Sequence, residues 1–338
     1  MNTKNIKKDY DIFARDETLV YLDSCATSLT PRAVTAKILE YYNSYNANVA
    51  RGAYTISARA TEEFESSRRF VANFINAQPE ETVFTSGTTA SLNMIAYGLA
   101  GQIKSSNNIV TTAMEHHANF IPWQELCKNS GADFRITKTT QEGLLDQENL
   151  LNLIDENTKI LALTHVSNVL GTINPIDEII KQVRAKNSNT IIVIDAAQSV
   201  SHLPIDVANI DCDFLAFSMH KLFGPTGVGV LFGKKSQLEK LTPIFTGGEM
   251  IEEVTSTCTT FRELPHRLEA GTPNIAGVIA TKETIAYTKQ FSFDEIREHE
   301  TSLLTHCQEQ LQENFGNDIT IYGPTNVTLR CGAISFTF

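Results

Sequence analysis

The sequence predicts an α/β protein in which a mostly parallel β-sheet flanked by helices forms a large unit, followed by a smaller α+β unit. Two observations indicate this fold class. Short runs of apolar, often β-branched residues recur along the chain, and segments of helical periodicity lie between several of them. The composition agrees, because 42% of the 338 residues are apolar and 20% are charged, as in globular proteins with an extensive core.

The predicted strands are continuous apolar runs, which are typical of strands that helices cover on both faces. In chain order they span residues 82–85, 109–112, 160–164, 191–194 and 214–217. The predicted helices between them span residues 90–100, 121–128 and 176–186. Strands that alternate with helices indicate parallel pairing, because a parallel crossover needs a long connection.

After about Thr260 this alternation gives way to two long predicted helices, at 274–290 and 293–314, and a closing strand at 333–338. A change of pattern of this kind marks a domain boundary. We therefore expect a large domain over residues 20–262 and a small domain built from residues 1–19 and 263–338.

The closing strand alternates with period 2, which places Ile334, Phe336 and Phe338 on one face. An apolar face of this kind requires a covering layer, and no remaining segment is expected to supply one. The pattern predicts that the small domain is incomplete and that the chain lacks a C-terminal segment.

Charge excludes several classes of partner. The net charge is −11 at pH 7 and no run of Lys or Arg exceeds two residues, so the basic surface that nucleic acid or anionic lipid requires is missing. No signal peptide and no run of about 20 apolar residues is present, and we expect a cytoplasmic protein. The six cysteines form no Cys-x-x-Cys motif, which favours reduced thiols over disulfides, and no metal site is expected.

The residues that follow the predicted strands are polar, and in open α/β sheets ligands bind at the carboxyl ends of strands. Gly87, Thr88 and Thr89 open a predicted helix, where they could bind an anion or simply cap the helix. His116 follows the second run and Asn168 the third. The alternatives at these two positions are a hydrogen-bonded histidine of no special function and a helix-capping asparagine.

Asp195 closes the fourth run, where an aspartate can cap a helix, bind Mg²⁺ or accept a proton from a cationic ring nitrogen. Lys221 follows the fifth run, in the order Ser218-Met219-His220-Lys221, and a surface lysine in a Gly-rich turn is the alternative there. Two nucleotide-binding motifs are excluded. No Gly-x-Gly-x-x-Gly opens a helix, and Lys235 stands where a P-loop needs Ser or Thr.

Pyridoxal 5′-phosphate fits this set of residues, because the cofactor needs a lysine for a Schiff base, a carboxylate on the pyridine nitrogen, a phosphate cradle and a ring-stacking group. Lys221 is the predicted Schiff-base lysine, Asp195 the predicted carboxylate and His116 the predicted stacking residue. The predicted phosphate ligands are Gly87, Thr88, Thr89, Ser218 and His220.

From about Tyr21 to its last residue, the chain resembles the group II, Suf-type cysteine desulfurases of the class V aminotransferase family. The motifs that carry the resemblance are Tyr21-Leu22-Asp23-Ser24, Arg51-Gly52, Gly87-Thr88-Thr89, Met114-Glu115-His116-His117-Ala118-Asn119, His165-Val166-Ser167-Asn168, Asp195-Ala196-Ala197-Gln198, Ser218-Met219-His220-Lys221 and Glu269-Ala270-Gly271-Thr272-Pro273-Asn274. The resemblance implies the fold type I architecture and a homodimer with active sites at the subunit interface. It also implies that sulfur leaves L-cysteine as an enzyme persulfide, with alanine as the other product, for iron-sulfur cluster assembly through a Suf-type sulfur-acceptor protein.

The resemblance also implies residue roles. Lys221 and His116 would be catalytic, and Gln198 would contact the ring oxygen of the cofactor. Asn168 would lie beside the ring and, with Arg51, bind the substrate. Thr272 would reach the phosphate bound by the partner subunit.

The chain departs from the family pattern in two places. Family members continue past the position equivalent to Phe338 with a segment that holds the nucleophilic Cys and a carboxylate-binding Arg, which we expect this chain to lack. Little sulfur transfer is therefore expected of the chain as it stands. Ala50 stands where the Suf-type enzymes usually carry His. Neither Cys25 nor Cys331 is expected to replace the nucleophile, because a reactive thiol needs an activating environment.

Other activities remain open at this stage. One is another class V reaction, such as that of a selenocysteine lyase or of a different pyridoxal-phosphate lyase or aminotransferase. Another is a non-catalytic homologue that keeps the fold without turnover.

Overall fold

The computed structural model describes residues 3–50 and 52–338. The strands of its central sheet are Thr82–Thr85 (β1), Asn108–Thr112 (β2), Asp133–Thr137 (β3), Thr158–Thr164 (β4), Ile191–Asp195 (β5), Phe214–Ser218 (β6) and Gly229–Gly233 (β7). Two hairpins lie outside the sheet, Ile251–Val254 (β8) with Thr259–Phe261 (β9) and Thr320–Tyr322 (β10) with Ser335–Thr337 (β11). The α-helices are Thr3–Ile6 (α1), Asp11–Arg15 (α2), Arg32–Ser44 (α3), Thr55–Phe74 (α4), Thr88–Gly98 (α5), Ile121–Ser130 (α6), Gln147–Leu153 (α7), Ile176–Lys186 (α8), Val207–Ile210 (α9), Lys235–Leu238 (α10), Ile275–Thr288 (α11) and Phe293–Phe315 (α12).

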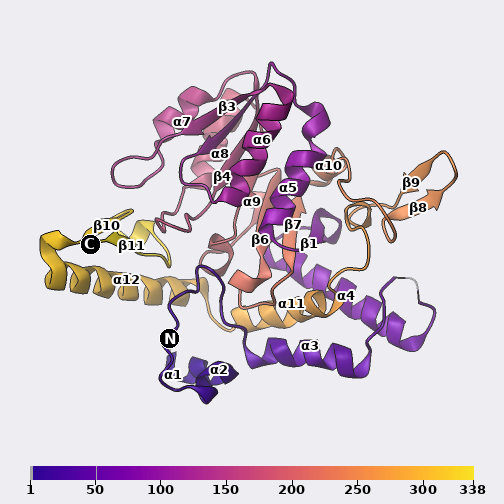
Figure 1. Cartoon of the computed structure of the whole chain (residues 1–338), viewed down its shortest axis with the longest axis horizontal. Helices are drawn as coiled ribbons and strands as arrows, with labels where there is room; N and C mark the ends of the chain where they lie inside the picture. The colour runs from indigo at the N-terminus through magenta and orange to yellow at the C-terminus, as the bar shows by residue number, and fades with distance from the viewer. Residues whose placement is uncertain (1–2, 51) are drawn as a thin grey trace.

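The central sheet has seven strands in the order β1-β7-β6-β5-β4-β2-β3 (Figure 1). Strands β3, β2, β4, β5 and β6, in that spatial order, pair in parallel. Strand β7 runs antiparallel to both of its neighbours, β6 and β1. The predicted α/β fold with a mostly parallel sheet is confirmed.

Alternate residues of each central strand enter two separate hydrophobic cores, because successive side chains of a strand point to opposite faces. On β5, Ile192 and Ile194 join the core that also contains residues of α4, α8 and α11. Ile191 and Val193 of the same strand join the core formed with α5 and α6. Burial of each such aliphatic side chain stabilises the fold by about 1.5–3 kcal/mol.

All five predicted strands are present, and β1 has the predicted bounds. Two further strands of the central sheet, β3 and β7, and the short strands β8, β9 and β10 escaped prediction. β3 is a partly exposed edge strand with alternating residues, and β7 begins and ends in glycine. Gly229 of β7 is required by close packing, since a Cβ there would lie 2.4 Å from Cα of Gly87. Strand β7 therefore passes directly against the turn that opens α5.

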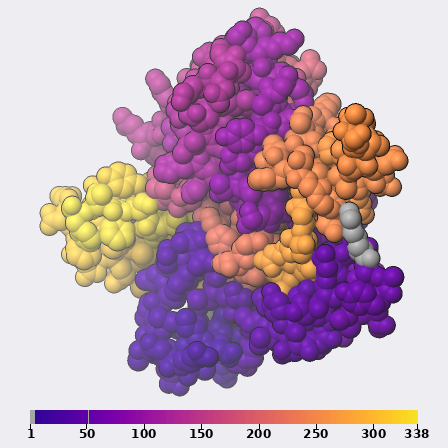
Figure 2. Space-filling model, turned by 45° about the vertical axis from the view of Figure 1, so that its right-hand side comes forward, coloured from indigo at the N-terminus to yellow at the C-terminus, as the bar shows by residue number. Residues whose placement is uncertain are grey.

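The C-terminal part of the chain divides between the main body and a lobe at its side. Helix α11 packs against α3 and α4, and Ile275 and Ile279 belong to the same core as the sheet. Helix α12 and the β10–β11 hairpin form the lobe at the left of Figures 1 and 2. The division into domains over 20–262 and over 1–19 with 263–338 stays a prediction.

The predicted closing strand is β11, which pairs with β10. The ring centroids of Phe338 and of Phe315 on α12 lie 4.9 Å apart. Phe336 and Phe338 nevertheless remain exposed, so the described residues cover this end of the hairpin only in part.

Within residues 3–50 and 52–338, no helix is long and apolar enough to cross a membrane. In the same part of the chain, no group of three or more His, Cys, Asp or Glu side chains is placed to hold a metal ion. All six cysteines are free thiols.

Candidate active site

A cavity of about 480 Å³ lies at the carboxyl ends of β4, β5 and β6 and the amino end of α5; we call it the strand-end cavity. Most of the predicted site residues line it: Thr88, Thr89, His116, Asn168, Asp195, Gln198, Ser218, His220 and Lys221. Gly87 is the residue that precedes α5, beside this lining. Thr272 is exposed and does not line the cavity, and Arg51 lies outside the described residues.

Lys221 contributes a partly buried amine to the strand-end cavity. Among the described residues, the ammonium group has no hydrogen-bond or ion-pair partner. Burial lowers the pKa of Lys221, although the carboxylate of Asp195 opposes that effect. An amine with a lowered pKa is more readily neutral and hence nucleophilic.

Asp195 is the last residue of β5 and is buried. Its Oδ1 accepts a hydrogen bond of 2.9 Å from the backbone N–H of Ala197. Burial raises the pKa of Asp195, whereas the cationic amine of Lys221 lowers it. A buried carboxylate that lines a cavity gains most from a cationic partner, because a charge in a low-dielectric site is costly when unpaired.

Ser218 and Thr88 form a compact group of donors at the amino end of α5. The backbone N–H of Thr88 donates to Oγ of Ser218 at 2.7 Å, and the two hydroxyl oxygens lie 2.7 Å apart. Helix α5 has 11 residues, and the dipole at its amino end favours an anion. This corner of the strand-end cavity would suit an anion.

His116 occupies the residue position that precedes a short 3₁₀ turn, His117–Asn119. Its Nδ1 accepts a hydrogen bond of 3.0 Å from the backbone N–H of Ala118, so the ring proton is placed on Nε2 when the imidazole is neutral. Desolvation lowers the pKa of His116. The ring is therefore neutral at pH 7.

Sequence reasoning did not identify the part played by the loop from Asp23 to Ser28. Ser28 donates to the backbone oxygen of His220 through both its N–H and its hydroxyl, each at 2.8 Å. Thr27 Oγ1 lies 3.1 Å from His220 Nδ1. The run Asp23-Ser24-Cys25-Ala26-Thr27-Ser28 is rich in small hydroxyl residues, which was the available signal.

Cys25 also lines the strand-end cavity. Its backbone oxygen accepts a hydrogen bond of 2.9 Å from Gln198 Nε2, so in this structure Gln198 contacts the loop. The role of Gln198 toward a cofactor ring stays a prediction. Burial raises the pKa of the Cys25 thiol, which leaves it protonated and weakly nucleophilic at pH 7.

An ion pair between Glu269 and Arg68 holds the start of the loop that carries Thr272. Glu269 accepts two hydrogen bonds from the buried guanidinium of Arg68, at 2.7 and 2.9 Å. Its Oε1 also accepts the backbone N–H of Phe84 on β1 at 2.6 Å. This pair joins α4, β1 and the approach to α11, and it escaped sequence reasoning because 201 residues separate its members.

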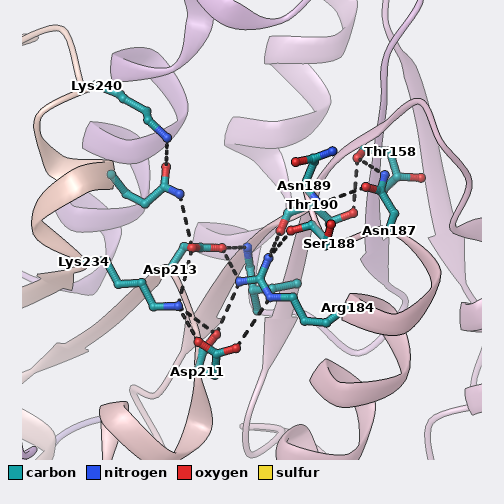
Figure 3. Close-up of polar contacts among 12 residues, drawn as sticks. Thr158, Arg184, Asn187, Ser188, Asn189, Thr190, Asp211, Asp213, Lys234 and Lys240 are labelled. Carbon is teal, nitrogen blue, oxygen red and sulfur yellow. Dashed lines mark hydrogen bonds and ion pairs between the residues drawn. The ribbon is translucent and has the colours of Figure 1, made fainter.

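A second cavity, of about 640 Å³, lies at the opposite edge of the sheet, and its lining includes Ile191, the first residue of β5. There the buried Asp213 accepts from Arg184 at 2.7 Å and from the backbone N–H of Ile192 at 2.8 Å (Figure 3). Lys234 pairs with Asp211 at 2.5 Å. These charges neutralise one another, and none of the predicted site residues lines this cavity. The strand-end cavity is therefore the candidate active site.

Comparison with known proteins gives a family match that covers residues 20–338, to the family described as aminotransferase class-V. Among curated proteins, the chain is 43% identical to a probable cysteine desulfurase of Halalkalibacterium halodurans, over 99% of this chain and 82% of the relative. It is 41% identical to a cysteine desulfurase of Escherichia coli, over 98% of this chain and 81% of the relative.

Solved structures give the same result. The apo structure of a cysteine desulfurase from Thermococcus onnurineus superposes with a TM-score of 0.92 at 37% identity, over 99% of this chain and 82% of that one. The S-sulfonic acid form of the Escherichia coli cysteine desulfurase CsdA gives a TM-score of 0.90 at 32% identity, over 100% of this chain and 83% of that one.

Proposed function

Because this chain belongs to the class V aminotransferase family and its relatives are cysteine desulfurases, we propose that it removes sulfur from L-cysteine with pyridoxal 5′-phosphate as cofactor. In the balanced reaction, L-cysteine and an acceptor thiol give L-alanine and a persulfide of that thiol, and Cys25, whose raised pKa keeps it protonated, is not proposed as the acceptor. The substrate loses its Cβ–S bond, and the sulfur forms the S–S bond of the persulfide.

The observation that carries the proposal is the unpaired amine of Lys221 in the same cavity as the buried carboxylate of Asp195 and the donor group of Thr88 and Ser218. These residues fit the aldehyde, the ring nitrogen and the phosphate of pyridoxal phosphate, respectively. Gly87, Thr89 and His220 would complete the phosphate site.

When bound, the cofactor withdraws electron density from the substrate Cα. Lys221 would attach the cofactor and move the proton at Cα, since its lowered pKa makes the neutral amine accessible. Asp195 would keep the ring nitrogen protonated by supplying the opposite charge. His116, a neutral ring at the cavity wall, would cover one face of the cofactor and shield it from water. Asn168 and Arg51 are proposed to contact the substrate.

The wider assignment belongs to the same proposal. We infer a homodimeric, cytoplasmic enzyme that delivers sulfur to a Suf-type acceptor protein for iron-sulfur cluster assembly. Thr272 is exposed and outside the cavity of its own chain, which supports its proposed role at the phosphate of a second subunit.

The deciding experiment is to incubate the purified protein with pyridoxal phosphate, reduce it with borohydride and map the labelled peptide. We expect the label on Lys221, with a Lys221→Ala variant unlabelled and a Lys234→Ala variant labelled as strongly as the unsubstituted protein. A label on Lys234, or none at all, would refute the site. Comparing L-cysteine with L-selenocysteine as the source of alanine then separates a desulfurase from a selenocysteine lyase.

A further inference from the structure

Glu115 lies directly before His116 but does not line the strand-end cavity. Three donors converge on its carboxyl group. Oε1 accepts from the hydroxyl of Thr112 at 2.7 Å and from the backbone N–H of Thr164 at 2.9 Å. Oε2 accepts from Nδ2 of Asn119 at 2.5 Å. The side chain therefore joins the end of β2, the end of β4 and the turn that carries His116.

The orientation of the Asn119 amide follows from a fourth residue. Oδ1 of Asn119 accepts a hydrogen bond of 3.0 Å from Nε1 of Trp123, a fully buried side chain. The indole N–H can only donate, so Oδ1 must face Trp123 and Nδ2 must face Glu115. At position 115 this arrangement requires an oxygen that accepts a hydrogen bond.

The contact with Thr164 lies where the two strands separate. The β2–β4 ladder runs from the pair Asn108–Thr158 to the pair Val110–Leu161. Past the end of this ladder, the backbone N–H of Thr164 points toward β2. It donates its hydrogen bond to the carboxyl group of Glu115 and not to the backbone of β2. Parallel strands that part at their carboxyl ends open a cleft for a ligand, and the carboxyl group of Glu115 spans that opening.

Thr164 and His116, the two residues that Glu115 joins, both line the cavity. Thr164 lines it and is paired in register with Asp195. His116 lines it from a turn in which its backbone oxygen accepts the N–H of Asn119 at 2.8 Å. Burial raises the pKa of Glu115, while the hydrogen bonds from Thr112, Thr164 and Asn119 lower it.

We propose that Glu115 is a positioning residue of the active site, whose carboxyl group replaces the β2–β4 ladder at the cavity and so fixes His116 and Thr164 for the cofactor. This inference rests on the proposed function, because it assigns Glu115 a role toward bound pyridoxal phosphate. It predicts that a change at Glu115 alters both the affinity for the cofactor and the orientation of the bound ring.

The test measures the dissociation constant of pyridoxal phosphate by absorbance and the visible circular dichroism of the bound cofactor. In Glu115→Gln, the NH₂ of the new amide must face a donor in either orientation, the NH₂ of Asn119 or the N–H of Thr164. We expect the dissociation constant to rise about tenfold, with altered ellipticity. Thr112→Val removes one of the three donors, and a smaller rise, of about threefold, is expected.

A double variant restores the pattern of donors and acceptors. In Glu115→Gln/Asn119→Asp, the amide at position 115 can donate to the carboxylate at position 119, whose other oxygen still accepts from Trp123. We expect affinity and ellipticity to return to within about threefold of the unsubstituted protein. Glu125→Gln on α6, which loses only a surface pair with Lys128, is the matched control and should change neither quantity.

The outcomes separate the two levels of the argument. If the unsubstituted protein fails to bind pyridoxal phosphate, the proposed function is wrong. If it binds, but Glu115→Gln and Thr112→Val match it in affinity and ellipticity, the role of Glu115 is wrong and the proposed function stands. A double variant that regains the thermal stability of the apo protein but not the cofactor ellipticity would likewise overturn the role of Glu115.

Discussion

At the scale of single residues, burial shifts the pKa values of five groups in the strand-end cavity. The pKa values of Lys221, His116 and His220 are lowered, and those of Asp195 and Cys25 are raised, with desolvation as the largest cause in each case. Desolvation disfavours the charged form of each group. A ligand whose charges are opposite to those of the site therefore stabilises the charged forms more strongly in this buried cavity than in water. Pyridoxal phosphate, with a cationic ring nitrogen and an anionic phosphate, is a ligand of this kind.

Asp195→Asn should still permit attachment of the cofactor to Lys221, because the lysine itself is unchanged. A neutral amide cannot stabilise the protonated ring nitrogen, so exchange of the substrate α-proton with deuterated solvent should slow by roughly 10²-fold. Proton NMR of the amino acid measures this exchange. Asp177→Asn on the exposed start of α8 is the control, and equal exchange in all three proteins would remove Asp195 from its assigned role.

Cys25 should be alkylated slowly by iodoacetamide at pH 7, because burial raises the pKa of its thiol and the thiolate is the reactive form. Cys258 is exposed and should react first, and labelling of Cys25 should accelerate as the pH rises above 8. Bound pyridoxal phosphate should protect Cys25. Mass spectrometry of timed samples gives the order, and labelling of Cys25 at pH 7 as fast as Cys258 would make it a candidate nucleophile after all.

At the scale of elements, the Arg68–Glu269 pair decides how α4, β1 and the approach to α11 meet. The guanidinium of Arg68 is buried and also bonds the backbone oxygen of Thr82 at 2.8 Å, while Glu65 supplies a second carboxylate at 2.9 Å. These partners raise the pKa of Arg68 in spite of its burial. The cation is therefore retained inside the fold and depends on its acceptors.

Glu269→Gln should lower the free energy of unfolding by about 3 kcal/mol, because removal of one partner leaves a buried charge undercompensated. Urea unfolding at one fixed protein and cofactor concentration measures the change. The matched control is Glu62→Gln, which breaks an exposed pair with Arg69 and should cost less than about 1 kcal/mol. Equal changes in the free energy of unfolding for the two substitutions would show that the buried pair contributes no more to stability than the exposed pair.

At the scale of the whole molecule, large apolar side chains remain exposed around α3 and the segment before it. Leu22 is 90% exposed and Val20 74%, and on α3 itself Leu39 is 59% exposed and Tyr42 56%. Leu39 and Tyr42 stand three positions apart and so share one face of α3, and exposed apolar surface of this kind often marks a protein–protein contact. This surface supports the proposed homodimer.

Sedimentation analysis should therefore give a dimer, twice the chain mass of 37.4 kDa. The double variant Leu39→Glu/Tyr42→Glu should shift the equilibrium toward monomer, since buried charges at an interface are costly when unpaired. Lys181→Glu on the exposed side of α8 controls for the change of charge. A monomeric unsubstituted protein, or a double variant as dimeric as the control, would contradict this assignment of the interface.

The sequence by itself determined the central strands and the residues that follow them. Continuous apolar runs such as 191–194 and helical periodicity such as 176–186 are local patterns, and they require no knowledge of distant parts of the chain. Because parallel strands end at one edge of a sheet, the order along the chain already predicted that Asp195, Asn168 and Lys221 would meet. The structure brings all three to one cavity.

Only the tertiary structure decided which side chains hold these residues in place. Glu115 meets Thr164 across 49 positions, Gln198 meets Cys25 across 173, and Arg68 meets Glu269 across 201. Strand β7 was missed for a related reason, since Gly229 serves close packing against Gly87, and Gly233 serves close packing against Leu238 and Phe214. A hydrogen bond between distant residues depends on the packing of whole elements, so no local periodicity carries a signal for it.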